Sequence, residues 1–358
     1  MFKKISGLQK YELFRILLSI AISLAVVLAI ILLISDMPFE ALKDFIFGPL
    51  ESVRRVGNVI EAAIPIMFTG LAVIILFRSG LFNLSMEGGF FIASVAAVAS
   101  ALVFDFSPVV NLILATVVAM IVGGISTVIP GILKEKTDAN ELVTSLMFNY
   151  VLLFLGLYII TTYFYDPEMN STYSYKFAEG MQLPKLIPGT NVHLGLIVGI
   201  IASLGLWVIL NKTSFGFKMT LIGENREMAR YSGISISKVV IISQFLGGVF
   251  TGLGASMQLF GMYTRFQYTG LTNYGWDGIL VAIIARRNPL YVPIAALFFG
   301  YLRTGASIMS RNTDIPYEII SIIQAIVIVL ISSEVILANY KKKVISQETL
   351  SKQGGSSL

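Results

Sequence analysis

Residues 80–89 read GLFNLSMEGG and residues 270–278 read GLTNYGWDG, so one spacing of Gly, Leu, Asn, an acidic residue and Gly occurs twice, 190 residues apart. Two further pairs of short segments keep the same order along the chain: FTGL at 68–71 and 250–253, and ELVT at 141–144 with EIIS at 318–321. The ordered agreement of the three pairs predicts an internal repeat.

The composition places this repeat in a membrane. Of the 358 residues, 56% are hydrophobic and 13% charged, with a mean hydropathy of +0.81, whereas soluble domains carry about 25% charged residues. At roughly 20 apolar residues per bilayer crossing, the chain has room for about ten helices with short connections. We therefore predict an all-α polytopic membrane protein, with a single transmembrane domain over 1–340 and a polar cytoplasmic tail over 341–358.

Apolar runs bounded by charges, Gly or Pro locate the expected helices. They cover residues 16–35, 59–77, 86–104, 109–132, 141–162, 191–210, 239–262, 274–287, 290–308 and 317–338. The first run follows basic residues, as in a signal peptide. Its length exceeds the usual signal length of about 7 to 15 residues and no small-x-small cleavage site follows, so we interpret it as an uncleaved helix.

The distribution of Lys and Arg predicts the orientation of the helices. If the N-terminus is cytoplasmic, the inside segments hold 18 basic residues and the outside segments 7, while Arg303 falls within a helix. Cytoplasmic loops carry the excess of positive charge in membrane proteins. Both termini and the loop 211–238 are therefore expected inside, and the loop 163–190 outside.

The repeat maps helices 2–5 onto helices 7–10. Because a separation of five helices is odd, the two copies would cross the membrane in opposite senses, which predicts an inverted repeat of the kind that many transporters use. Gly-interrupted apolar segments at corresponding places in two halves are the sequence pointer to a transport site. Those segments are here 80–89 and 270–278.

Several function classes are excluded by composition. The chain has no cysteine, and His193 is its one histidine, which excludes disulfides and thiolate metal sites and argues against imidazole zinc sites and Ser/His/Asp hydrolases. The net charge of +5 is interpreted as the cytoplasmic-loop bias and not as a sign of nucleic-acid binding. We therefore expect no metal, no nucleic acid and no catalytic residues.

Polar residues inside apolar runs are the candidates for the solute pathway. They are Asn83, Glu87, Asn149, Trp276, Asp277, Arg303 and Gln324. A structural alternative is that Asn83 and Asn273 cap restarting helices, with Glu87 and Asp277 near the positive ends of those helices. Arg303 is the strongest single candidate because an ionisable group inside a membrane usually faces a bundle interior or wet cavity, although it could snorkel or pair with a buried acid. For Asn149, Gln244, Gln258 and Gln324, interhelical hydrogen bonding is the alternative.

Within the loop 211–238, called the basic loop below, residues 223–234 read GENREMARYSGI. Gly at both ends, acids first and Arg230 late predict a helix of about two turns. Met228, Ala229 and Tyr231 could fill a groove on a soluble partner. Alternatively, the segment is a surface helix that merely joins two spans. The tyrosine- and proline-containing loop 163–190 likewise has two interpretations, a docking surface for an external partner or an aromatic belt.

Five segments resemble the permeases of ATP-binding cassette importers for ribose-like sugars, branched-chain amino acids and nucleosides. They are GLFNLSMEGG at 80–89, NELVTSLMFNY at 140–150, LIGENREMARYSGI at 221–234, YGWDGILVAIIARRNP at 274–289 and RTGA at 303–306. The resemblance covers about residues 59–335, and the segment 80–89 is most similar to nucleoside-type permeases.

The resemblance implies ten helices, cytoplasmic termini and a location in a prokaryotic cell membrane. It also implies a coupling helix over 223–233 that sits in a cleft of a cytoplasmic ATPase; its contact residues would be Gly223, Glu224, Asn225, Met228, Ala229, Tyr231, Ser232 and Gly233. Similar proteins often have Ala where this chain has Met228, which affects the packing of that contact. The chain has no G-x-x-x-x-G-K-[ST] loop, so ATP and Mg would be bound by the partner ATPase and no cofactor by this chain.

The implied partners are the ATPase subunit, a second permease of the same or a similar kind, an extracytoplasmic solute-binding protein and membrane lipid. The expected function is nucleoside import without enzymatic activity in this chain. Alternatives are the same importer class for a sugar, a riboflavin-like or another small polar solute, or an ion-coupled secondary transporter, which also tolerates inverted repeats. A membrane-embedded enzyme is the remaining rival.

Overall fold

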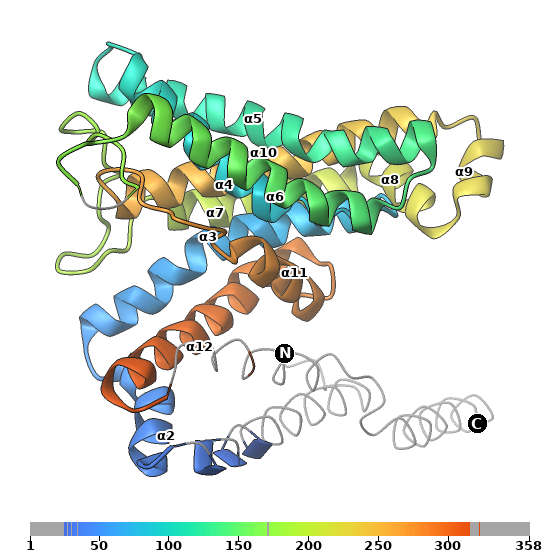
Figure 1. Cartoon of the computed structure of the whole chain (residues 1–358). Helices are drawn as coiled ribbons and strands as arrows, with labels where there is room; N and C mark the ends of the chain where they lie inside the picture. Colours follow the sequence, from blue (N-terminus) through green and yellow to red (C-terminus); the bar gives the residue numbers. More distant parts are fainter. Residues whose placement is uncertain are drawn as a thin grey trace, which may run out of the picture. The chain divides into compact units, whose positions relative to one another are not determined.

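The computed structural model describes residues 25, 26, 28, 29, 31–33, 35–169, 172–315 and 322. Within these residues the chain is helical, and its β-structure is limited to two isolated bridges, Tyr165 with Ser174 and Lys185 with His193. The chain divides into two compact units, residues 49–304 and residues 1–48 with 305–358. Each unit is described separately, and Figure 1 labels the helices.

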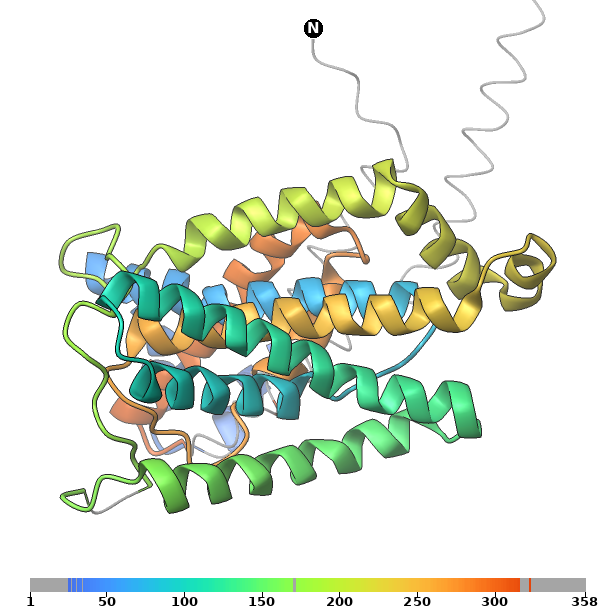
Figure 2. The same cartoon turned by 90° about the horizontal axis from the view of Figure 1, so that it is seen from above.

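The larger unit contains most of the helices. They are α3 (Val53–Arg78), α4 (Met86–Val103), α5 (Pro108–Thr137), α6 (Glu141–Ile159), the π-helical turn η2 (Ile160–Phe164), α7 (Gly195–Lys212), α8 (Ser214–Glu224), α9 (Arg226–Tyr231), α10 (Ile236–Met262), α11 (Tyr274–Ile284), the 3-10 turn η3 (Pro289–Tyr291) and the first part of α12 (Val292–Asn312). Figure 2 shows α4, α5, α6, α7 and α10 running side by side along one direction.

Among the residues that the structure describes, seven helices are long and apolar enough to cross a membrane: α3, α4, α5, α6 extended by η2, α7, α10, and α12 preceded by η3. Each overlaps one of the expected spans, with bounds that agree within a few residues except at the start of α3 and the end of α5, which extend further. The expected span 274–287 corresponds to α11, whose 11 residues are about 16 Å long and too short to cross a bilayer alone. The expected helix 16–35 is described at only a few positions, which are helical apart from Ser35, and 317–338 lies outside the described residues except for position 322.

Burial separates a central layer from a peripheral one. The apolar windows of α3 and α4 are 89% and 78% buried, whereas those of α5, α6 and α7 are 33%, 28% and 28% buried. The outer face of α5 exposes a row of apolar side chains at a spacing of four residues: Ile113, Val117, Ile121, Ile125 and Ile129. An exposed apolar row of this length is unfavourable in water, and it is consistent with a surface that contacts lipid.

Helices α5 and α10 cross with their backbones in contact. A β-carbon on Gly248 would overlap the carbonyl oxygen of Gly123, and one on Gly252 would overlap that of Ala119. The hydroxyl of Thr127 also donates to the carbonyl of Gln244, at 2.8 Å. Small residues at a helix crossing permit this close packing in membranes.

Two non-helical segments run through the larger unit. Residues 79–85 connect α3 to α4 without helical structure, and residues 263–273 lead into α11. Buried side chains in the first segment include Leu81, Asn83 and Ser85. Irregular backbone at membrane depth requires internal hydrogen-bond partners, and these partners belong to the candidate site.

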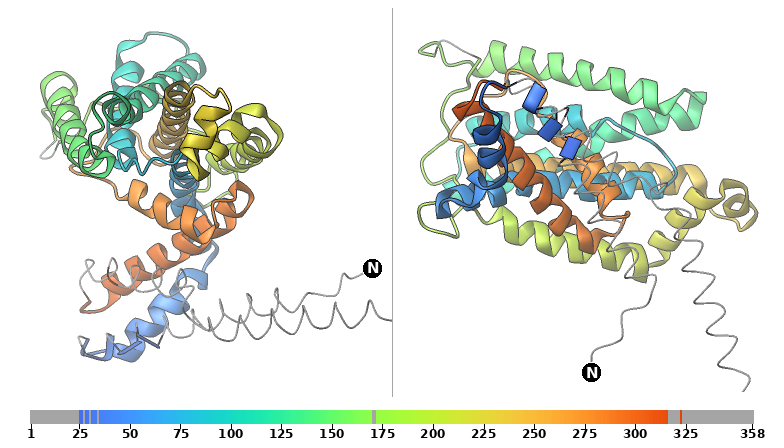
Figure 3. Two further views of the ribbon diagram at one scale, coloured as in Figure 1. Left: turned by 90° about the vertical axis from the view of Figure 1, so that its right-hand side faces the viewer. Right: turned by 90° about the horizontal axis from the view of Figure 1, so that it is seen from below.

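The two ends of the larger unit carry different loops. Helices α8 and α9 lie at one end, beside the turn between α5 and α6, and the connection 165–194 lies at the opposite end (Figures 1 and 2). The left view of Figure 3 looks along the bundle onto the α8–α9 end. If the bundle crosses a membrane, the two loops emerge on opposite sides.

The smaller unit contains α2 (Pro38–Ile46) and the last turns of α12. Asp314 accepts hydrogen bonds from the Ser35 hydroxyl, at 2.6 Å, and from the Asp36 backbone N–H, at 2.8 Å. Asn312 donates to the Asp44 carboxylate at 2.8 Å. These contacts join residues that are more than 260 positions apart in the sequence.

Candidate solute pathway and coupling site

The carboxylate of Glu87 joins the beginnings of two helices. Glu87 lies in the first turn of α4, and its oxygens accept hydrogen bonds from the backbone N–H groups of Asn273, at 2.5 Å, and Gly275, at 2.6 Å, where α11 begins. The Thr272 hydroxyl donates to the same carboxylate at 3.3 Å. A negative charge next to helix N-termini is electrostatically favoured. Glu87 therefore connects the two Gly-interrupted segments that the sequence repeat singled out.

The expectation that Asn273 caps α11 is wrong. Asn273 is the N-cap residue, but its backbone is left-handed, with φ 63°, and its side chain makes no capping hydrogen bond. The reason is that the Glu87 carboxylate already accepts the N–H groups at the start of α11. A partner 186 positions away thus replaces the local cap.

Asn83 and Asn149 hold the non-helical segment before α4. Asn83 accepts from the backbone N–H of Ser85, at 2.9 Å, and its amide donates at 2.8 Å to the carbonyl of Thr127 and to the side chain of Gln244. Asn149 on α6 accepts from the N–H of Gly88, at 2.9 Å, and donates to the carbonyl of Leu84, at 3.0 Å. The Asn83 bond to Ser85 lies next to the start of α4, as a local cap would; the other bonds tie the segment to α5, α6 and α10.

Asp277 and Arg303 form a mostly buried ion pair. The Nη1 atom of Arg303 lies 2.8 Å from the Oδ2 atom of Asp277, and its Nη2 donates to the carbonyl of Thr272 at 3.3 Å. The guanidinium also lies over the ring of Tyr274, 4.6 Å from its centre. Arg303 therefore pairs with a buried acid, which was one of the alternatives given for it in the sequence analysis. Its position over the aromatic face of Tyr274 is a further stabilising contact.

Trp276 and Gln324 are not placed with this group. Trp276 lies on the same helix as Asp277 but is 40% exposed, which separates it from the buried polar residues. Gln324 lies outside the described residues. The structure therefore brings together Asn83, Glu87, Asn149, Asp277 and Arg303 within the larger unit, as two clusters that α11 connects.

Glu61 is a buried acid that the sequence analysis missed. It lies on α3 within an apolar run, is 8% exposed, and accepts a hydrogen bond from Gln258 of α10 at 2.8 Å. Gln258 also donates to the Tyr274 hydroxyl at 3.3 Å, which connects Glu61 to the Arg303 group. The sequence alone could have identified Glu61, because an acidic residue between apolar residues is as unusual in a membrane span as an arginine.

The basic loop folds as two short helices. The expected single helix over 223–233 is wrong at its start: α8 ends at Glu224, and α9 begins at Arg226 after Asn225, whose side chain accepts the Met228 N–H at 2.9 Å. Gly233 ends α9 with a left-handed backbone, φ 74°. A capping Asn before the helix and a left-handed Gly after it define a two-turn unit at this end of the protein.

The exposure of α9 corrects the expected contact surface. Ala229 is fully buried within this chain, whereas Met228 is 56% exposed and Tyr231 is 89% exposed. Ala229 therefore cannot fill a groove on another protein. The apolar side chains that α9 leaves available are Met228 and Tyr231.

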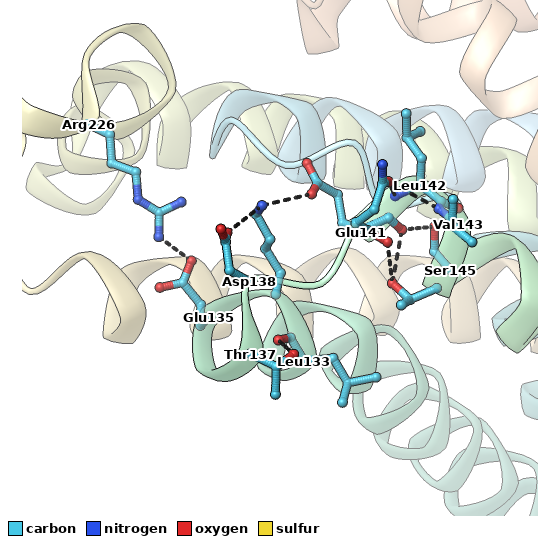
Figure 4. Close-up of polar contacts among 12 residues, drawn as sticks. Leu133, Glu135, Thr137, Asp138, Glu141, Leu142, Val143, Ser145 and Arg226 are labelled. Atoms are coloured by element: carbon cyan, nitrogen blue, oxygen red, sulfur yellow. Dashed lines mark hydrogen bonds and ion pairs between the residues drawn. The ribbon is translucent and has the colours of Figure 1, made fainter.

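Three contacts attach α8 and α9 to the membrane helices. Arg78 at the end of α3 donates to the Thr220 hydroxyl of α8 at 2.9 Å. Gly223 packs on Gly80, since its Cα lies 3.0 Å from the position of a Gly80 β-carbon, and a β-carbon on Gly223 would overlap the Arg78 carbonyl oxygen. Arg226 of α9 pairs with Glu135 of α5. Figure 4 shows Arg226 and Glu135 pointing toward each other.

The neighbouring turn between α5 and α6 is held by its own charges. Lys134 lies 2.8 Å from Asp138 and 3.6 Å from Glu141, and Figure 4 labels these two acidic residues. The hydrogen bond from Lys134 lowers the pKa of the Asp138 carboxyl. Asn140 caps α6 by accepting from Leu142 and Val143, at 3.0 and 3.3 Å.

The family described as "Branched-chain amino acid transport system / permease component" matches residues 55–332. The guanosine ABC transporter permease protein NupP of Bacillus subtilis is 32% identical over 312 residues, which cover 85% of this chain and 89% of that protein. The glucose ABC transporter permease protein TsgB13 of Haloferax volcanii is 32% identical over 308 residues, covering 83% and 81% of the two chains. The nucleoside ABC transporter permease protein NupB of Lactococcus lactis is 29% identical over 310 residues, covering 84% and 85%.

Proposed function

The chain belongs to the family of permease components of branched-chain amino acid transport systems, and we propose that the solute it carries is a nucleoside. As a member of this family it is the multi-pass membrane subunit of an ATP-binding cassette transporter and is not itself catalytic. The nucleoside assignment is carried by the likeness to two permeases named for guanosine and nucleosides, each covering more than four fifths of this chain.

A sugar is the second candidate solute. The permease named for glucose is as identical to this chain as the guanosine permease. The buried polar core of the larger unit favours neither solute by charge, because nucleosides and sugars are both uncharged. The two candidates differ in the nucleobase, and transport measurements can separate them.

The test compares uptake in a strain that lacks this permease with uptake in its parent. We expect the deletion to abolish high-affinity uptake of radiolabelled guanosine and to leave glucose uptake unchanged, and we expect a plasmid copy of the gene to restore guanosine uptake. Loss of glucose uptake with normal guanosine uptake would replace the nucleoside with the sugar.

We propose ten membrane crossings with both termini in the cytoplasm. Seven candidate spans support this count; the runs 16–35 and 317–338 would add two, and the segment 263–273 together with α11 would make one. In this arrangement the segment before α4 and the segment before α11 correspond as the two members of an inverted repeat. Their meeting at Glu87 supports that correspondence.

Cysteine labelling tests the orientation cleanly because the native chain contains no cysteine. Ser214 and Tyr175 are both exposed. A membrane-impermeant maleimide should label a Tyr175→Cys variant in intact cells, and a Ser214→Cys variant only after the cells are opened. The reverse pattern would place 211–238 outside.

The proposed partners are a cytoplasmic ATPase that binds ATP and Mg, a second permease and an extracytoplasmic solute-binding protein. We propose that α9 and the end of α8 contact the ATPase. ATP binding would shift the permease pair between inward-facing and outward-facing states, which requires that the ATPase bind the two states with different affinity. The contacts of Gly223 and Arg226 supply the physical attachment of this loop to the membrane helices.

A further inference from the structure

The carboxylate of Glu135 holds two other helices to the end of α5. Glu135 lies in the last turn of α5, and its Oε2 accepts a hydrogen bond at 2.7 Å from the hydroxyl of Ser237, in the first turn of α10. Its Oε1 is bound by Arg226, the first residue of α9. The Glu135 side chain is only 6% exposed, although the next residue, Lys136, is exposed. Each oxygen of this covered carboxylate therefore serves a different helix.

Helices α5 and α10 are also fastened to each other further along. Glu135 and Ser237 each lie about three turns from the backbone contact between Gly123 and Gly248. Between these two levels, a β-carbon on Gly131 would lie 2.9 Å from a side-chain atom of α10. Close contact at several levels joins two membrane helices tightly. The bond between Glu135 and α9 therefore attaches α9 to both helices at once.

Helix α8 is attached to a different part of the larger unit. Its Gly223 contacts Gly80, in the non-helical segment 79–85. Asn225 alone separates α8 from α9, and its backbone is extended, with φ −153° and ψ 100°. The basic loop therefore connects the segment 79–85 to the α5–α10 pair, with a non-helical residue between its two attachments.

We propose that Glu135 is a positioning residue for coupling, which passes a displacement of α9 to the α5–α10 pair. This inference rests on the proposed contact between α9 and the ATPase. When the ATPase displaces α9, the pair follows it, whereas the segment 79–85 is held by α8 on the other side of Asn225. The two parts then change their relative position, as a change of access between the two sides of a membrane requires.

The chemistry of the attachment suits this role. Hydrogen bonds between a guanidinium and a carboxylate are stronger and more directional than those between neutral groups. If the bond between Glu135 and Arg226 is lost, α9 can be displaced without the α5–α10 pair. ATP would then be hydrolysed without solute being carried, which is a different defect from failure to bind the ATPase.

The experiment uses the complete importer in proteoliposomes, with the ATPase, the second permease and the binding protein. It measures uptake of radiolabelled guanosine together with ATP hydrolysis, and glucose replaces guanosine if the deletion test assigns a sugar. Glu135→Gln removes the charge and leaves one accepting oxygen in place of two. We expect the solute carried per ATP hydrolysed to fall by about fivefold, with ATPase affinity and the rate of hydrolysis close to wild type.

Exchange of the two charges identifies the partner. Glu135→Arg and Arg226→Glu each place like charges together, and each should lower the ratio of solute to ATP. The double variant restores an ion pair and should recover most of that ratio. Arg226→Gln breaks the same pair from its more exposed side, so it still tests the attachment if a Glu135 variant does not fold.

Asp138→Asn is the matched control. It makes the same change from carboxylate to amide in the turn that follows α5, but Asp138 is exposed and accepts from Lys134 of its own segment. Its ratio should equal that of the wild type. Hydrolysis and uptake that fall in proportion in Glu135→Gln, or a double variant no better than its single variants, would overturn the inference. Failure of the ATPase to bind the wild-type permease would instead contradict the proposed contact, and this inference with it.

Discussion

The Cα atom of Gly223 lies 3.0 Å from the point that a β-carbon on Gly80 would occupy, so the backbones touch where α8 meets the non-helical segment 79–85. That segment leads through Asn83 to Glu87, whose carboxylate binds the start of α11. The contact therefore provides a continuous route from the proposed ATPase-binding loop to the buried polar core. Its glycines are required by distance, because a side chain at either position would separate the two backbones.

Gly223→Ala tests this route. Gly223 has an ordinary backbone conformation, so the added methyl group acts through its volume, overlapping the Arg78 carbonyl oxygen. Overpacking at such a site costs about 1–3 kcal/mol, and we expect the variant to bind the ATPase and hydrolyse ATP while solute uptake falls by about tenfold. Gly205→Ala is the control, since a β-carbon at Gly205 meets no atom within 4 Å. Equal uptake by the two variants would remove the Gly80–Gly223 contact from the mechanism.

Tyr231→Ala tests the surface of α9. The side chain is 89% exposed, so its removal leaves the fold of this chain unchanged. Tyrosines at the centre of an interface often contribute about 2 kcal/mol, and we expect binding of the ATPase to weaken by roughly 30-fold in a pull-down titration with purified subunits. Tyr150→Ala on α6, where the tyrosine is 58% exposed, should not affect it. ATPase affinity that is identical in both variants would exclude Tyr231 from the interface.

Removal of Arg303 separates a structural role from a role in the pathway. Arg303→Met leaves Asp277 buried without its cation, and breaking such a pair costs about 3–5 kcal/mol. The double variant Arg303→Met with Asp277→Leu removes both charges and should recover most of this loss, as measured by the unfolding temperature in detergent. Uptake should remain low in both variants. An Arg303→Met protein as stable as the wild type would show that the ion pair contributes little.

His193 makes the stability depend on pH. Its Nδ1 accepts the Gly195 N–H at 3.2 Å, so the proton of the neutral ring is on Nε2, which is buried against Gly261 without a partner among the described residues. Burial lowers the pKa of His193 to about 4. Above pH 6.5 the ring is neutral in both states. Between about 6.5 and 4 only the unfolded chain takes up the proton, so folded stability decreases by up to about 3 kcal/mol.

His193→Asn isolates this effect from the carboxylates that titrate in the same range. Asparagine can still accept the Gly195 N–H but does not titrate. The difference in unfolding temperature between wild type and variant, followed from pH 7.5 to pH 4, should shift steadily against the wild type below pH 6.5. Parallel curves for the two proteins would mean that His193 has an ordinary pKa.

The positions of the spans could be predicted from the sequence because apolar length alone determines them. Each of the seven candidate spans begins and ends within a few residues of its apolar run, apart from the N-terminal extension of α3 and the C-terminal extension of α5. The end of α11 could be predicted less well, because the expected helix runs to residue 287 whereas α11 ends at Ile284. Arg286 and Arg287 both adopt left-handed backbone there, a feature that hydropathy does not report.

The site residues also fall into those that the local sequence identifies and those that depend on contacts between distant segments. Asp277 and Arg303 were identifiable because charge is rare in these runs, and Glu61 would have been found by applying that rule to every acid. The cap of α11 could not be predicted, because Glu87 reaches it across 186 positions. The burial of Ala229 likewise depends on packing between segments, and a small apolar residue in a surface loop carries no local sign of it.

The glycine crossing of α5 and α10 limits which parts of the protein can move. The backbones of the two helices are in contact at Gly123 with Gly248 and at Ala119 with Gly252. No side chains separate the helices at these points, so neither helix can shift along the other without a steric clash. We expect the pair to remain a rigid body throughout the transport cycle. We expect hinges where helical hydrogen bonds are missing, and residues 79–85 and 263–273 are two such segments inside the larger unit. Conformational change would then pass through such segments, while the crossing stays fixed.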